Sequence, residues 1–319
     1  MNAKLHSAGP RHSFASDFLL LLLANAIWGA TDVVAKAVLP AVSPPALAWL
    51  RLSIALLAFS PALWKFRAEI PRTLGGLLPF LAAGVCGFFL NFVFQYAGLS
   101  RAPASHATAL RVLEALAIFF LSGLILGERL LLRALLGLAA GLAGVVLILD
   151  LDFRRLALFG SGYRLGDLII ILGIVVESFY TIIGKRILGR TRPLLATALA
   201  CTAGWLLLSL GFGPRLVVEL SQAPPPLSAW LAALYLGLVA TAFGYWMWYR
   251  VLARQASHQV GFTILAQPVV GIPLAAIVFH DPLPPSFLFG AALVALGGYL
   301  AISSAASKKE APEFSEVSS

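Results

Sequence analysis

Long apolar stretches alternate with short polar or Pro/Gly-rich breaks along almost the whole chain. Cutting at these breaks leaves segments of about 20 residues, the length at which an α-helix crosses a hydrocarbon core of roughly 30 Å. Barrel strands alternate apolar and polar positions over only about 10 residues, so continuous hydrophobicity predicts helices. The ten predicted membrane-spanning segments are residues 17–37, 44–64, 75–99, 104–126, 130–150, 165–187, 193–213, 228–251, 257–279 and 284–304.

Composition supports this interpretation. Of 319 residues, 60% are hydrophobic and 12% charged, and the mean hydropathy is +0.91, whereas soluble domains carry roughly 25% charged residues. A soluble helical protein would need amphipathic helices to cover its core, and the long segments here are apolar on all sides. The first segment continues into Trp28, Asp32 and Lys36 without a small-residue cleavage site, so we expect a membrane span rather than a signal peptide. The predicted class is an all-α integral membrane protein.

The distribution of basic residues predicts an orientation in the membrane. The net charge of +9 comes mainly from Lys and Arg in short loops, which favours control of topology over nucleic-acid binding. With the N-terminus in the cytoplasm, fifteen basic residues fall on the cytoplasmic side and five on the other. The five are Arg101, Arg154, Arg155, Arg164 and Arg215. Both termini are therefore expected in the cytoplasm, in agreement with an even number of spans.

The two halves of the chain resemble each other. Trp28 to Lys36 aligns with Glu177 to Lys185 at an offset of 149 residues. Because each half holds five predicted spans, an odd number, the second half should enter the membrane from the opposite side, and inverted repeats of this kind place a site at the midplane. The expected organisation is a cytoplasmic tail (1–16), a first repeat (17–150), a linker (151–164), a second repeat (165–304) and a disordered cytoplasmic tail (305–319).

An ordered set of motifs carries a family resemblance. The first half contains IWGATDVVAKAVL, LSRAPASHATAL and LILGERL, and the second contains LGDLIII, ILAQPVVGIPLAAIVFHDPL and FGAALVALGGYLAI. In these motifs and their order, over nearly the whole chain, the sequence resembles the EamA type of the drug/metabolite transporter superfamily. The resemblance implies a ten-helix transporter of the inner membrane that exports small metabolites. The sequence departs from the family pattern at Ala115, where a proline is usual and beside which Glu114 lies, and at Glu177, where an apolar or aromatic residue is usual.

Ionisable residues within the spans are the strongest candidates for function, because each costs about 2.5–3.5 kcal/mol to insert. At about 1.5 Å per residue, Glu114 lies about 15 Å and Glu177 about 18 Å into their segments, close to mid-membrane. Gln267 lies at a similar depth. The repeat alignment places Glu114 opposite Gln267 and Glu177 opposite Trp28, so these four positions are expected to form the floor of a central cavity.

Two charged pairs stand at helical spacing. Arg111 and Glu114 are three residues apart, and Asp32 and Lys36 are four apart, so each pair is able to meet on one helix face. Mutual neutralisation and a role in transport both remain open for these pairs.

Glu177 has no basic partner within four residues on its own helix. A substrate-ammonium contact or a proton-carrying role is one interpretation, and pairing with Arg51 or Arg111 across the bundle is the other. Arg51 itself is either an anchor near the outer surface or a substrate contact. The predicted cavity residues are Trp28, Asp32, Arg51, Asn91, Arg111, Glu114, Glu177, Tyr180 and Gln267, with Glu114 and Glu177 as the candidate proton carriers.

Other chemistries lack a signature. The histidines are scattered without HExxH spacing, and Cys86 and Cys201 lie singly in apolar segments, so neither a metal nor a cofactor is expected. No P-loop or GxSxG motif occurs, so coupling to ATP within this chain is excluded. The sequence predicts a secondary transporter that exports small polar or zwitterionic metabolites by alternating access, with protons as a candidate coupling ion. The alternatives are a facilitative channel or exchanger, including a nucleotide-sugar-like antiporter, and a membrane-embedded enzyme.

Overall fold

The length of the apolar segments determines most of the architecture. The computed structural model describes residues 14–148, 163–280 and 285–309, and these are helical without a strand. Most of the predicted linker and of both predicted tails lies outside them. Within these residues, eight helices are long and apolar enough to cross a membrane by length and composition: Ser16–Val38, Pro44–Lys65, Leu74–Leu99, His106–Leu126, Arg164–Ile187, Pro193–Gln222, Leu227–Leu252 and Ser257–Phe279. Two shorter apolar helices, Leu132–Ile148 and Phe287–Leu300, occupy the fifth and tenth predicted segments.

The first half runs from α1 to α8 and includes a 3₁₀ turn (η1) and a π-helix (η2). Its elements are α1 (Phe14–Gly29), α2 (Thr31–Val38), α3 (Pro44–Lys65), η1 (Arg67–Glu69), α4 (Leu74–Gly84), η2 (Val85–Leu90), α5 (Asn91–Leu99), α6 (Ala104–Leu110), α7 (Val112–Leu126) and α8 (Leu132–Ile148).

The second half runs from α9 to α15 and includes a π-helix (η3) and a 3₁₀-helix (η4). Its elements are α9 (Arg164–Ile187), α10 (Pro193–Gln222), α11 (Leu227–Leu234), η3 (Tyr235–Phe243), α12 (Gly244–Leu252), α13 (Ser257–Phe262), η4 (Thr263–Ala266), α14 (Gln267–Phe279) and α15 (Phe287–Lys309). Helix α10 continues nine residues beyond the predicted end at 213, because Pro214 is accommodated inside the helix.

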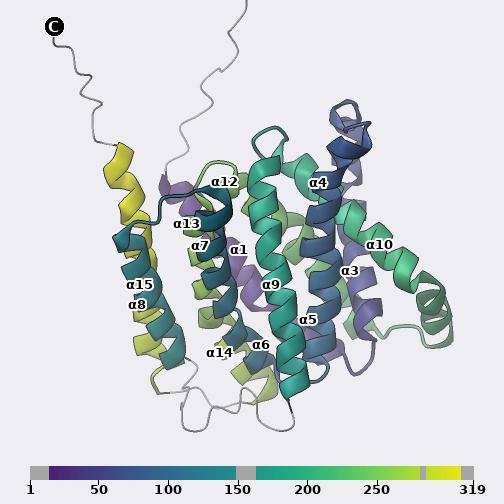
Figure 1. The fold of residues 1–319 in the computed structure, drawn as a ribbon. Coiled ribbons are helices and arrows are strands. Elements are labelled where there is room, and N and C mark those ends of the chain that lie inside the picture. The colour runs from purple at the N-terminus through teal and green to yellow at the C-terminus, as the bar shows by residue number, and fades with distance from the viewer. Residues whose placement is uncertain (1–13, 149–162, 281–284, 310–319) are drawn as a thin grey trace, which may run out of the picture.

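The helices form one bundle (Figure 1). Helices α8 and α15 pack together at one edge, α3 and α10 pack together at the other, and α5 and α9 lie between them. The first turn of α1 and the last turn of α15 both lie at the upper end of the bundle in this view. The described chain therefore begins and ends on the same side.

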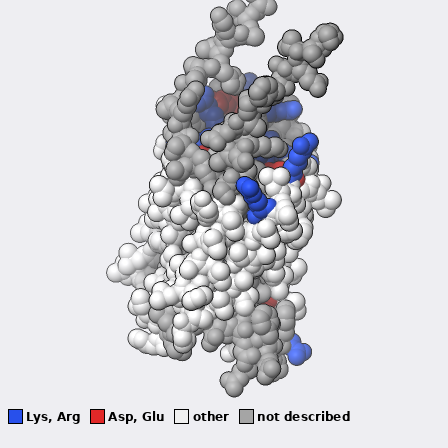
Figure 2. Space-filling view, turned by 90° about the vertical axis from the view of Figure 1, so that its left-hand side faces the viewer, with Lys and Arg blue, Asp and Glu red and all other residues white. Residues whose placement is uncertain are grey.

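The outer surface is apolar. Leu124, Leu210 and Ile277 are 83%, 80% and 72% exposed, which is typical of side chains that face lipid. Figure 2 shows charged side chains mainly toward the upper end, with a broad band of uncharged residues below them. Together with the spans, this surface identifies a protein that crosses the membrane several times.

Several spans are broken near their middle, and the breaks position polar groups inside the bundle. Helix α1 gives way to α2 at Ala30, α6 gives way to α7 at Arg111, and η4 leads into α14 at Gln267. The third and eighth predicted segments contain the π-helices η2 and η3 at corresponding places. Irregular backbone at this depth is tolerated where protein or a cavity, rather than lipid, surrounds it.

Two lysines at repeat-related positions hold helix ends in the same way. The Lys36 ammonium donates to the carbonyl oxygens of Leu99 and Ala102, at 2.6 and 2.9 Å. The Lys185 ammonium donates to Leu252 and Gln255, at 2.8 and 2.6 Å. Of the two interpretations left open for Asp32 and Lys36, mutual neutralisation does not hold, because the carbonyls at the end of α5 accept the hydrogen bonds of this cation instead.

Glycines bring α8 and α15 into close contact. A Cβ atom on Gly144 would lie 2.6 Å from the Gly290 carbonyl oxygen, and one on Gly297 would lie 2.6 Å from that of Gly137. Small residues of this kind let helix backbones approach each other where no hydrophobic effect drives association.

Neighbouring glycines of α15 provide a matched test of this packing. We expect Gly297→Ala to lower stability by about 1–3 kcal/mol, because its methyl group overlaps the α8 backbone. Gly298 faces open space, so Gly298→Ala should leave stability unchanged or raise it by up to about 1 kcal/mol through helix propensity. Thermal unfolding in detergent measures both, and an equal loss in the two variants would contradict the proposed contact.

Candidate functional site

A small polar cavity lies inside the bundle and is lined from both halves of the chain. The broken spans supply much of its lining, since they turn polar side chains inward. The lining residues are Trp28, Thr31, Asp32, Arg51, Phe92, Gln95, Tyr96, Arg111, Glu114, Glu177, Tyr180, Thr181, Tyr245, Trp248 and Gln267. Its free volume is about 30 Å³, enough for about two water molecules.

Arg111 is the centre of the charged groups in this cavity. Its Nη1 atom lies 2.5 Å from Glu177 Oε2 and 3.2 Å from Glu114 Oε2, and its Nε atom lies 3.8 Å from Asp32 Oδ2. The contact with Glu114 is the one that the helical spacing predicted. The contact with Glu177 crosses the bundle and is the structural alternative that the sequence left open. One guanidinium therefore bridges three carboxylates from α2, α7 and α9.

Neutral groups complete this network. Gln95 accepts a hydrogen bond from Arg111 and donates one to Asp32. The Tyr245 hydroxyl donates to Glu177 Oε1 at 2.6 Å. These contacts orient the carboxylates and fill lone pairs that would otherwise be buried without a donor.

The formal charges in the cavity do not cancel. Asp32, Glu114 and Glu177 contribute three negative charges, and Arg51 and Arg111 contribute two positive ones, which leaves an excess of one negative charge when all are ionised. All five side chains are largely or fully buried. Buried charge is costly unless it is paired, so this excess attracts a proton or a cation.

Arg51 forms the other positive group of the cavity. It is only 4% exposed, its Nε atom donates to Thr241 Oγ1 at 2.6 Å, and its Nη1 atom donates to the Tyr96 hydroxyl at 2.8 Å. Its guanidinium carbon lies 3.9 Å from the centroid of the Phe92 ring. Neutral oxygens and an aromatic face therefore fix its position.

An aromatic wall stands beside the charged groups. The ring of Trp28 lies 5.1 Å from that of Tyr245 and 5.3 Å from that of Trp248, measured between centroids. The indole nitrogen of Trp28 donates to the Ala240 carbonyl at 2.9 Å. These large, rigid surfaces are suited to the apolar part of a small solute.

The structure brings most of the predicted site residues together. Those that line the cavity are Trp28, Asp32, Arg51, Arg111, Glu114, Glu177, Tyr180 and Gln267. Asn91 does not line it. Its Nδ2 atom donates to the Gly87 carbonyl at 3.2 Å, within the π-helical segment η2, whose wider turns shift the following residues away from the face that α-helical spacing predicts.

Other lining residues were not among the predicted set. Phe92, Gln95 and Tyr96 stand at i, i+3 and i+4 on α5, and Thr181 stands at i+4 from the predicted Glu177 on α9. This spacing places each group on one helix face. Once one member of a face is assigned to the cavity, the spacing is the signal that identifies the others.

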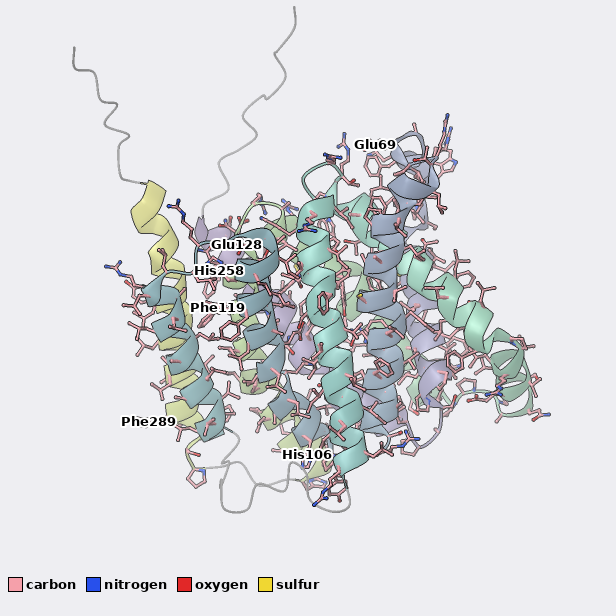
Figure 3. All side chains as sticks on the ribbon, viewed as in Figure 1. Glu69, His106, Phe119, Glu128, His258 and Phe289 are labelled. Carbon is pink, nitrogen blue, oxygen red and sulfur yellow. The ribbon has the colours of Figure 1, made fainter. Side chains whose placement is uncertain are left out.

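Contacts at the two ends of the bundle join the halves (Figure 3). At the upper end, Glu128 follows α7 and accepts hydrogen bonds from the backbone N–H of Ser257 and His258, at 2.7 and 3.2 Å, and lies 2.7 Å from His258 Nδ1. At the lower end, His106 Nδ1 of α6 lies 2.9 Å from Asp167 Oδ1 of α9.

These hydrogen bonds set the pKa of Glu128, which lies in the loop after α7. Partial burial acts to raise the pKa, but the bonds from the His258 side chain and from the backbone N–H groups of Ser257 and His258 outweigh it and lower the pKa to about 2. The carboxylate form of Glu128 is therefore strongly favoured in the folded protein.

A second hollow has a different character. It has a volume of about 310 Å³ and lies between α1, α14 and α15, where Thr263 is the one polar residue among apolar lining residues such as Leu22, Val269 and Val294. It offers no charged group to a polar solute. Among the described residues, no cluster of three or more His, Cys, Asp or Glu is arranged to hold a metal ion.

Comparison with known proteins places the chain among transporters. A model of the EamA-like transporter family matches residues 16–150 and 164–303. An uncharacterised transporter of Archaeoglobus fulgidus is 25% identical over 292 residues, covering 89% of this chain and 98% of the relative. A protein of Salmonella typhimurium described as a probable amino-acid metabolite efflux pump is 28% identical over 291 residues, covering 89% and 94%.

The fold also has a counterpart among solved structures. One crystal structure superposes with a TM-score of 0.72 at 23% sequence identity, covering 94% of this chain and 100% of that chain. This likeness concerns the fold alone. The matches to transporters point to transport rather than enzymatic catalysis.

Removing Arg111 tests the central network. We expect Arg111→Gln to lower the free energy of unfolding by about 3–5 kcal/mol, because three buried carboxylates lose their cation. The double variant Arg111→Gln with Glu177→Gln should recover part of this loss. Arg192 pairs with Glu69 while 64% exposed, so Arg192→Gln should cost at most about 1 kcal/mol. Thermal unfolding checks all three, and equal losses for both arginine variants would contradict the network.

Acid should selectively weaken the Glu128 contact. Because its pKa falls from 4.5 to about 2 in the folded state, its stabilisation is complete above about pH 4.5, declines as pH falls and is lost near pH 2. We expect Glu128→Gln to lower stability by about 1–3 kcal/mol at pH 7 and by progressively less below pH 4.5. Thermal unfolding from pH 7 to 3 measures this difference, with exposed Glu69→Gln as the control. A difference independent of pH would refute the assignment.

Proposed function

The chain belongs to the EamA-like transporter family, and on this premise we propose that it exports small zwitterionic metabolites, amino acids or their derivatives, across the inner membrane. The protein is a multi-pass membrane transporter. The observation that carries the finer proposal is the cavity itself, where three carboxylates and two guanidiniums meet beside an aromatic wall. The ammonium group of an amino acid would bind the carboxylates, and its carboxylate would bind a guanidinium.

The cavity supports a solute with both charges better than an ion or a sugar. A simple cation would satisfy the carboxylates but leave Arg51 without an anion, and a neutral sugar would leave the excess negative charge uncompensated. The aromatic rings of Trp28 and Tyr245 provide contact area for an apolar side chain. The Salmonella relative, described as a probable amino-acid metabolite efflux pump, supports the same class of solute.

The proposed topology has ten spans in two inverted repeats, with both termini in the cytoplasm. The eight long helices and the shorter α8 and α15 support the number ten. The two family matches, one in each half, and the corresponding lysine contacts of Lys36 and Lys185 support the repeat. The fifteen-to-five distribution of basic residues supports the cytoplasmic position of the termini.

The proposed transport cycle is alternating access around the cavity. Its free volume of about 30 Å³ is far too small for an amino acid, so the solute enters only when the bundle opens at one end. The upper contact of Glu128 with His258 and the lower contact of His106 with Asp167 each join the two halves. Breaking one contact while the other holds would open one side of the membrane at a time.

A proton is the proposed coupling ion. The excess negative charge of the cavity is neutralised either by a proton on Glu114 or Glu177 or by the ammonium group of the solute. Because the two compete for the same carboxylates, proton entry on one face favours release of the solute there, which is the requirement of an antiporter.

Transport by purified protein in proteoliposomes tests the proposal. We expect uptake of at least one member of an amino-acid panel to be accelerated several-fold by an acidic interior. Glu114→Gln and Glu177→Gln should each lower this gradient-driven uptake by about 10-fold or more, because the competing site is lost. Arg192→Gln is the control on the exposed surface.

Counterflow distinguishes the mechanisms. Acceleration by unlabelled solute on the far side, without any effect of the pH gradient, would identify a facilitative exchanger and refute proton coupling. Full activity in both glutamate variants would refute the site assignment.

A further inference from the structure

Arg51 is only 4% exposed and, unlike Arg111, has no anionic partner among the described residues. The ion pairs among the described residues involve Arg111, Arg192, Arg254, His106 and His258, and none includes Arg51. The cavity carboxylates are instead gathered around Arg111. A buried guanidinium without a counter-ion is expensive, since neutral oxygens repay only part of its desolvation.

Much of the hydrogen-bonding capacity of Arg51 is also unused. Guanidinium groups carry five N–H donors, and Arg51 donates through Nε to Thr241 and through Nη1 to Tyr96. Its Nη2 atom has no acceptor among the described residues. The residue lines the cavity, so the remaining donors are available to a solute there.

The surroundings of Arg51 fix its direction. Thr241 lies in η3 of the second half, Tyr96 lies on α5 of the first, and the Phe92 ring supports the guanidinium plane at 3.9 Å. A guanidinium held in one plane is prepared for two parallel hydrogen bonds to a carboxylate, a geometry that an ammonium group does not reproduce.

A row of aromatic rings connects the surroundings of Arg51 with those of Glu177. Phe92 lies against Arg51, its centroid is 6.3 Å from that of Tyr245, and the Tyr245 hydroxyl donates to Glu177. Arg51 and Glu177 therefore stand at opposite ends of this row of rings, and both line the cavity. The two ends therefore select different groups of one solute.

We propose that Arg51 is the carboxylate-binding residue of the transport site and the residue that discriminates amino acids from the corresponding amines. This inference rests on the proposed function, because it assigns the residue that binds the carboxylate of the proposed zwitterionic solute. Arg111, already engaged with three carboxylates, does not perform this role.

Matched pairs of solutes test the assignment. Affinities for each of the standard amino acids and for its decarboxylated amine, such as phenylalanine and 2-phenylethylamine, are measured by thermal shift and by competition in proteoliposome counterflow. We expect the wild-type protein to prefer the amino acid by about 10- to 100-fold, as one charge-assisted bidentate contact implies. Arg51→Lys and Arg51→Gln should abolish this preference, with the amine's affinity changed less than about 3-fold.

Further variants keep the test independent of folding defects. Tyr96→Phe and Thr241→Val retain Arg51 but each remove one of its hydrogen bonds, and we expect each to reduce the preference partially. Arg192→Gln, which removes an exposed guanidinium, should leave it unchanged. Loss of affinity for acid and amine in parallel, or an undiminished preference in folded Arg51 variants, would overturn the assignment while the proposed function stands. Binding of neither acids nor amines by the wild-type protein would overturn both.

Discussion

The cost of placing charge within a hydrocarbon layer is the constraint on which this structure depends. Arg111 meets it by bridging Asp32, Glu114 and Glu177, so that three costly carboxylates share one guanidinium. The bridge joins α2, α7 and α9, which come from both halves of the chain. The same interaction that makes the charges tolerable therefore also ties the halves together around the cavity.

Broken helices make this arrangement possible. A continuous helix directs its polar backbone groups along its own axis, whereas the breaks at Ala30, Arg111 and Gln267 turn side chains into the bundle. Lys36 and Lys185 then donate hydrogen bonds to carbonyls at the C-terminal ends of α5 and α12. These contacts hold the helix ends around an irregular middle.

Hydropathy predicted the helical segments because bilayer thickness sets their length, and the cost of burying ionisable groups, together with depth and the repeat alignment, pointed to residues that line the cavity. Which charged residues pair with each other was harder to predict from the sequence. The contact of Glu177 with Arg111 spans 66 residues and depends on which helix faces meet. Helical spacing left an Asp32–Lys36 pair open because spacing ignores competing carbonyls, and Asn91 was misplaced because the π-helix before it has no clear sequence signal.

The small size of the cavity has a consequence for the cell. A membrane that stores energy as an electrochemical gradient cannot tolerate a continuous file of water molecules through its proteins, since ions and protons would dissipate that gradient. With space for about two waters and Arg111 bound to its carboxylates, the cavity holds far too little water for such a file.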